Sequence, residues 1–130
     1  MARQRQLEWD KQGDLDAHCR FHEELPPGVM LSAPTAYLHQ RSADDPETWV
    51  NKTTEVTIAA AIVDALDDDW VAISGGTSRA VRVVVTKDPQ TQPDVTDEPE
   101  PNDNYRVKIV ATRSDSSRPI AREVPLVILP

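Results

Sequence analysis

Proline is the residue that most constrains how this chain can fold. It occurs eleven times in 130 residues, against only four glycines. Proline is unfavourable inside helices and at central positions of a sheet, because it has no N–H to donate to the hydrogen-bond ladder. We therefore expect many short segments separated by proline-containing turns.

The segments between these turns show the two-residue period of half-buried strands. The period is clearest in 105–112 and 120–129, where apolar and polar residues alternate. The side chains of the first segment that should face the core are Tyr105, Val107, Ile109 and Ala111. Weaker strand patterns occur in 6–10, 15–25, 29–40, 54–60, 70–73 and 80–86.

Several of these segments permit more than one interpretation. Residues 6–10 fit an edge strand, a docking arm or a mobile tail anchored only by Trp9. Residues 15–25 also permit a helix, since they contain no proline or glycine. Pro34 predicts an edge strand or two short strands in its segment, and Pro125 predicts that the last strand lies partly at an edge.

Short strands at nearly regular spacing, with turn signals between them, predict an all-β fold, an antiparallel β-sandwich. A chain of this length suits one domain. We place that domain at 14–130 and an N-terminal arm at 1–13. Residues 87–104 hold four prolines and are rich in acidic residues. They should form a long exposed loop inserted in a hairpin, because they have too little apolar surface to offset the entropy of ordering.

The charge balance argues against several kinds of partner. With 14 basic and 22 acidic residues, the net charge is −8. Such a chain should bind neither nucleic acid nor anionic membranes. No apolar run approaches the roughly 20 residues of a membrane helix. The polar start of the sequence predicts no secretory signal, and the single cysteine fits synthesis in a reducing cytoplasm.

The sequence offers little to support catalysis. His18, Cys19 and His22 are the only cluster of metal-ligand types, but on a strand Cys19 points away from the two histidines. Cys19 itself should be a buried structural thiol beside Phe21. We therefore predict no catalytic residue, no cofactor and no metal site, and we expect that the protein is not an enzyme.

Tryptophans are the better candidates for a functional role. Trp9, Trp49 and Trp70 each lie near acidic residues. One should fill the core, and an exposed tryptophan could anchor a partner. We name Trp9, Trp49 and Leu7 as candidate partner-binding residues. The alternative is that all three tryptophans pack in the core or at its rim.

Two strings in the second half of the chain carry a resemblance to a known family. Trp-Val-Ala-Ile-Ser-Gly-Gly-Thr at 70–77, followed by the alternating strand 105–112, resembles the small phage proteins known as fiber–tail adaptors. A polar turn at 114–118 and a final alternating strand at 121–129 are similar as well.

The opening residues 13–17, Gly-Asp-Leu-Asp-Ala, also resemble the start of that family. The likeness covers about half of the chain, in scattered pieces. It departs from the family at 78–104, where this sequence inserts an extra strand and the acidic loop.

The resemblance implies an immunoglobulin-like β-sandwich without a catalytic role. It implies a virion protein, made in the host cytoplasm, that joins fibers or neck and tail components at the head–tail junction or tail. The partners would be other virion proteins, namely neck, tail or fiber subunits, in a symmetric multi-copy assembly. The Trp9 arm would then dock on a neighbouring subunit.

Two other functions fit the same fold. A capsid decoration or cement protein is also an acidic β-sandwich, but it is present in more copies than an adaptor. A free-standing module that binds protein or carbohydrate would need exposed aromatic side chains along one surface, and the chain has only six aromatic residues.

Overall fold

The computed structural model describes residues 7–10, 14–42, 45, 47–51, 53, 56–86, 105–116 and 118–129. These residues form eight strands and one short 3-10 helix. In chain order the elements are β1 (Leu7–Asp10), β2 (Leu15–Arg20), η1 (His22–Glu24), β3 (Leu31–Arg41), β4 (Trp49–Asn51), β5 (Thr57–Val63), β6 (Ala80–Thr86), β7 (Tyr105–Arg113) and β8 (Pro119–Leu129).

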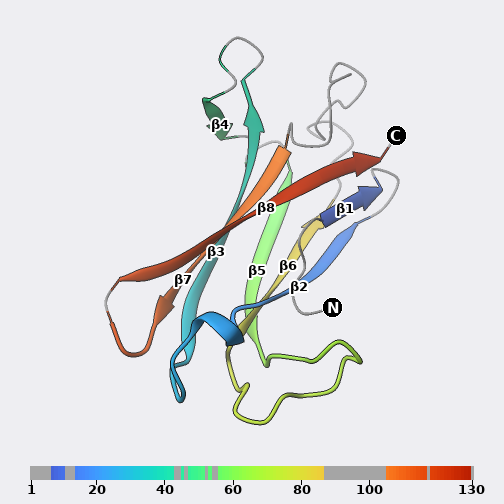
Figure 1. Ribbon diagram of the computed structural model, residues 1–130. Coiled ribbons are helices and arrows are strands. Elements are labelled where there is room, and N and C mark those ends of the chain that lie inside the picture. Colours follow the sequence, from blue (N-terminus) through green and yellow to red (C-terminus); the bar gives the residue numbers. More distant parts are fainter. Residues whose placement is uncertain are drawn as a thin grey trace.

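The strands form two sheets that pack against each other (Figure 1). One sheet has the order β1-β8-β7-β3-β4, and the other has the order β2-β6-β5. The predicted all-β sandwich is therefore confirmed. One pairing differs from a purely antiparallel fold, since β1 runs parallel to β8 with Leu7 opposite Leu126.

Alternating side chains from both sheets build the core. In β7 the buried residues are those predicted, and Val107 and Ile109 are fully shielded from solvent. From the other sheet, β6 contributes Val81, Val83 and Val85, which are also fully buried and belong to the same core cluster. Removing each such side chain from water stabilises the fold by roughly 1.5–3 kcal/mol. The shared core of buried side chains therefore holds the two sheets together.

Pro34 and Pro125 lie at strand positions where a missing N–H costs little. At Pro125, β8 pairs only with β7, because its pairing with β1 begins at Leu126. The predicted edge position of Pro125 is confirmed. Pro34 lies at a shift of register between β3 and β7, and β4 reaches β3 only from His39 onward. The edge strand, or pair of short strands, predicted from Pro34 is therefore wrong: β3 is one inner strand of 11 residues, and the register shift accommodates the proline.

Three predicted segments need correction. Residues 70–73 form no strand, and only Ala72 makes an isolated bridge, to Leu66. The strand placed at 54–60 is β5 at 57–63, and its alanines are extended because the valines of β6 pair along it. The strand predicted at 15–25 is shorter, since β2 ends at Arg20 and is followed by η1.

The long acidic loop at 87–104 lies outside the described residues. The strands on either side of it, however, belong to different sheets. The segment therefore connects the two sheets and is not an insertion in a hairpin. Of the predicted N-terminal arm, the structure describes residues 7–10, and these form the edge strand β1.

Replacement of Ile109 by aspartate should abolish cooperative folding. The side chain is fully buried, so the carboxylate would have no water and no partner, at a cost of more than about 4 kcal/mol. Val110→Asp is the matched control, because Val110 is one position along β7 on the opposite, half-exposed face. Thermal unfolding followed by circular dichroism would show a transition for the control only. A stable Ile109→Asp variant would contradict this assignment of faces.

Candidate functional site

The predicted partner-binding residues Leu7 and Trp9 lie inside the sandwich. Both side chains are fully buried, because they occupy the inward positions of β1 and β1 is paired with β8. In this structure they pack in the chain's own core. A docking role for them stays a prediction, and it would require β1 to leave its sheet.

Trp49, the third predicted residue, is half-buried on the outer face of the five-stranded sheet. Its ring lies between two guanidinium groups, with the Arg106 carbon 4.2 Å and the Arg41 carbon 5.1 Å from the ring centroid. Both distances fit cation–π contacts. Arg106 also forms an ion pair with Glu123 at 3.0 Å.

The residues around Trp49 form a surface that we call the basic aromatic face. Across the strands, His39 is opposite Arg106 and the two rings of Tyr37 and His39 stack at 6.4 Å. The pKa of His39 is lowered, first by partial burial and then by the charges of Arg106 and Lys108. Glu123 has the opposite effect on this pKa, so the surface carries charges of both signs. The members of the face are Tyr37, His39, Arg41, Trp49, Arg106 and Lys108.

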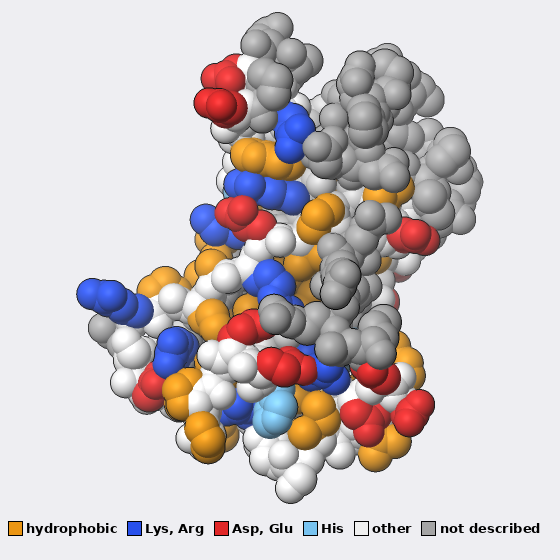
Figure 2. All heavy atoms as spheres, in the orientation of Figure 1, with side chains coloured by type: hydrophobic (Ala, Val, Ile, Leu, Met, Phe, Trp, Pro, Cys, Tyr) orange, Lys and Arg blue, Asp and Glu red, His pale blue; other side chains and the backbone are white. Residues whose placement is uncertain are grey.

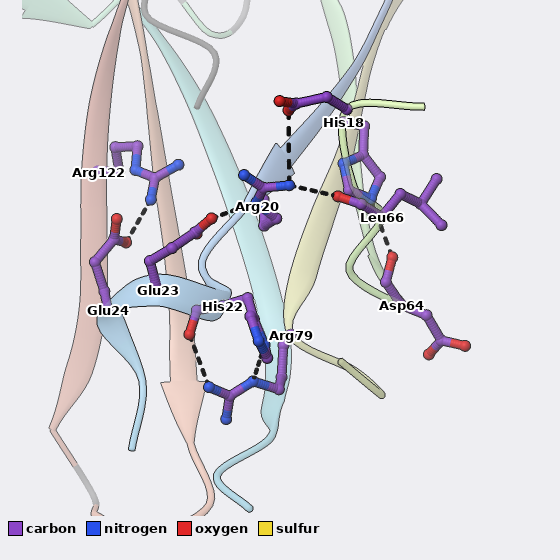
Figure 3. Close-up of polar contacts among 10 residues, drawn as sticks. His18, Arg20, His22, Glu23, Glu24, Asp64, Leu66, Arg79 and Arg122 are labelled. Carbon is purple, nitrogen blue, oxygen red and sulfur yellow. Dashed lines mark hydrogen bonds and ion pairs between the residues drawn. The ribbon is translucent and has the colours of Figure 1, made fainter. Parts of the chain in front are cut away.

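A second cluster closes one end of the sandwich and is centred on Arg79 (Figure 3). This arginine is almost fully buried, with 3% of its surface exposed. Its Nε donates to Nδ1 of His22 at 2.8 Å. Its two terminal nitrogens donate to four backbone carbonyls, those of His22, Leu25, Pro26 and Val29, at 2.7–2.8 Å. All five N–H groups of the guanidinium are thus used.

Arg122 holds the same loop from the other sheet. It lies on an inward position of β8, pairs with Glu24 and places its guanidinium 4.3 Å from the centre of the Phe21 ring. We call residues 21–30 the end loop. One arginine from each sheet therefore fixes the end loop, and both arginines are engaged in structure (Figure 3).

The histidines and the cysteine near this cluster do not converge. The ring of His18 contacts the backbone oxygen of Asp64 at 3.0 Å, whereas His22 accepts from Arg79. The thiol of Cys19 is buried, as predicted, and burial raises its pKa to about 11 against a partial opposing effect of Arg122. Within the described ranges, no group of three His, Cys, Asp or Glu side chains could hold a metal ion.

The segment 64–78 forms an ordered loop over the outer face of the smaller sheet. Arg20 of β2 donates to the Leu66 carbonyl at 2.7 Å, and the Ala65 N–H donates to the Gly76 carbonyl at 2.8 Å. A Cβ on Gly76 would lie 2.9 Å from the Ile73 oxygen and 3.1 Å from the Ala65 Cβ. This packing explains the glycine at position 76, and we call 64–78 the Trp70 loop.

Trp70 is exposed to solvent at the tip of this loop. Its side chain is 69% exposed, and that of the adjacent Val71 is 58% exposed. The backbone of Trp70 has a φ of 63°, a left-handed conformation that costs a bulky residue on the order of 1–3 kcal/mol. The Asp67 carboxylate holds the tip, because it accepts from the N–H groups of Asp69 and Val71 at 2.8 and 3.0 Å.

Sequence reasoning weighed Trp70 among the tryptophans but did not name it as a binding residue. It took residues 70–73 for a strand, where Trp70 would have been a core candidate. The signal that could have found it is the run Asp67-Asp68-Asp69 directly before the aromatic residue, since aspartate favours turns that accept backbone N–H groups.

Comparison with known proteins gives no family for this chain. No protein-family model, curated protein or solved structure matches it significantly. Among the described residues, no helix is long and apolar enough to span a membrane.

Substitution of Arg79 by lysine should destabilise the protein by about 2–4 kcal/mol, because an ammonium has three donors for five acceptors, which lie in buried or partly buried bonds. Arg82→Lys is the matched control. Arg82 lies three residues further along the chain, on β6, but it is exposed and pairs with Asp16. Urea unfolding of both variants measures the difference. Equal midpoints for Arg79→Lys and wild type would show that the buried network is not required.

Cys19 predicts a loss of stability at alkaline pH. Its pKa is about 11 in the folded protein and 9.0 when unperturbed, so the folded state retains the thiol proton longer. The contribution is complete below pH 9 and is lost as the pH rises through about 11, by about 2–3 kcal/mol in total. The measurement is the free energy of unfolding against pH for wild type and Cys19→Ala. Curves that stay parallel across this range would contradict the prediction.

Proposed function

We propose that this chain is a non-enzymatic structural protein that joins other protein subunits. In its specific form, the proposal is a phage virion protein that connects fibers or neck and tail components at the head–tail junction or tail. The observation that carries it is that tryptophan side chains reach two separate surfaces of one sandwich, half-buried at Trp49 and exposed at Trp70. These are the basic aromatic face and the Trp70 loop.

The internal chemistry of the sandwich supports a structural role. Arg79 and Arg122 are bound to carbonyls and a carboxylate that belong to the end loop. The Cys19 thiol is buried, and its raised pKa disfavours the reactive thiolate. These two arginines and the cysteine therefore contribute to the stability of the fold, and the outer surface is left for contacts with other proteins.

The strand order supports the finer assignment to the immunoglobulin-like sandwiches. In such domains the third, sixth and seventh strands share one sheet, and the second, fifth and fourth strands share the other. If β1 and β4 are set apart as additions to the five-stranded sheet, the remaining strands fit this division. The order β8-β7-β3 corresponds to the seventh, sixth and third strands, and the order β2-β6-β5 corresponds to the second, fifth and fourth strands. The protein has a single cysteine, so it lacks the disulfide that links the two sheets of antibody domains.

The residues behind the resemblance to fiber–tail adaptors shape turns and core. Gly75 has a φ of 74° and Gly76 packs against Ala65, so both serve the Trp70 loop. Tyr105 and Ile109 are core residues of β7. These roles suit a shared scaffold, and they leave the identity of the partner to experiment.

The test is to locate the chain in virions assembled from a genome that encodes it. Mass spectrometry of purified particles should detect the chain. Immunogold labelling with an antibody to it should mark the neck, the tail or the fiber base. Label spread over the capsid at high copy number would favour the decoration-protein alternative instead. Absence of the chain from purified particles would overturn the virion proposal.

A further inference from the structure

We propose that two copies of the chain pair through the free edge of β5, so that their two three-stranded sheets form one continuous sheet. The two copies are related by a two-fold axis at Ala60. This inference deepens the proposed joining function, on which it rests, by naming a second copy as one partner. The interaction surface is the edge of the smaller sheet, which Figure 1 draws with β5 beside β6.

The backbone of β5 has one hydrogen-bonding row without a strand partner. β5 is the last strand of its sheet, and it pairs with β6 from Thr57 to Val63 without a shift of register. β3 of the other sheet packs against β5 but does not pair with it. Within the part of the chain that the structure describes, β5 therefore has only one strand neighbour. A strand edge of this kind is a template for another strand.

The edge has none of the features that usually prevent such pairing. Proteins protect sheet edges with charged side chains, prolines, bulges or very short strands. β5 is seven residues long, and its sequence, Thr-Ile-Ala-Ala-Ala-Ile-Val, contains no charge, proline or glycine. Charged side chains of both signs are spread over the face of the molecule that Figure 2 shows. Among the described strands, β5 is the only one of more than three residues without a charged side chain.

The inward side chains of β5 are incompletely covered. Ile58, Ala60 and Ile62 pack against the core but remain partly exposed. The valines of β6 with which they pair, at positions 81, 83 and 85, are all fully buried. The core is thus less well covered at β5 than at β6. A strand added at this edge shields the two isoleucines from water, which stabilises the contact.

The sequence of β5 selects a second copy as the occupant. In either direction from Ala60, the next two residues are alanine and then isoleucine. In an antiparallel pair centred on Ala60, Ile58 therefore lies opposite Ile62 of the other copy. Ala59 likewise lies opposite Ala61, and these alanines are on the exposed outer face. Such a contact is isologous, because the same residues of both copies meet across the two-fold axis.

The first experiment is sedimentation equilibrium of the whole chain over a range of concentrations at about 0.15 M salt. The expected result is an equilibrium between monomer and dimer with no larger species, since a two-fold contact closes on itself. A monomer mass at every concentration would overturn the inference, and so would open-ended assembly. Either result would leave the joining function to the virion experiment, so the two failures can be told apart.

Paired charge substitutions test the register. Ala59→Glu combined with Ala61→Glu places like charges directly opposite each other twice, so this variant should associate at least about tenfold more weakly than wild type. Ala59→Glu combined with Ala61→Lys is the matched control, because each new glutamate then lies opposite a new lysine of the other copy. The control should associate at least as tightly as wild type. Both positions are exposed, so thermal unfolding should show that both variants are folded.

A mixture distinguishes this edge from any other interface. Ala59→Lys combined with Ala61→Lys should also associate weakly alone, for the same reason as the double glutamate variant. An equimolar mixture of the two should form a one-to-one dimer. Association of either variant alone as tightly as wild type would contradict the named edge, and a mixture that stays monomeric would overturn the register.

Hydrogen exchange tests the backbone pairing independently of the side chains. The β5 amides that do not bond to β6 should exchange slowly in concentrated wild type, where the second copy accepts from them. The same amides should exchange rapidly in the double glutamate variant. Rapid exchange of these amides in a wild-type dimer would show that the copies meet elsewhere.

Discussion

The buried guanidinium of Arg79 is the interaction on which the rest of the sandwich depends. The end loop has several backbone carbonyls that point inward, and an unpaired buried carbonyl is costly. Arginine can satisfy them because its planar group presents five donors in fixed directions. Arg79 directly precedes β6, and Arg122 lies on β8 of the other sheet. Their contacts with the end loop therefore connect this loop to both sheets. Phe21 and Leu25 can then close the core at this end.

The backbone of the Trp70 loop is strained at its tip. Trp70 has a left-handed backbone, and such a conformation persists only where neighbouring interactions impose it. Here Asp67 and the bond from the Ala65 N–H to the Gly76 carbonyl impose it, and Arg20 attaches the loop to β2. The exposed tryptophan is thus a product of several polar contacts that do not themselves face a partner.

Much of the fold, but little of the site, could be predicted from the sequence. Alternation gave the core face of β7 and the position of Cys19, because strand periodicity acts locally. The burial of Trp9 depends on parallel pairing with β8, more than one hundred residues away, and no local pattern encodes that pairing. Arg79 has no sequence signature either, since its partners are mostly backbone carbonyls, which every residue has.

The edges of the five-stranded sheet indicate which mode of joining the fold permits. Addition of a partner strand needs an exposed row of N–H and C=O groups. On β8, β1 covers the edge from Leu126 onward, and Pro125 removes a donor just before it. At the other end of the sheet, β4 is only three residues long. Since these edges offer few backbone groups, contacts through side chains, such as those around Trp49, are the more favourable way for the five-stranded sheet to hold a neighbour.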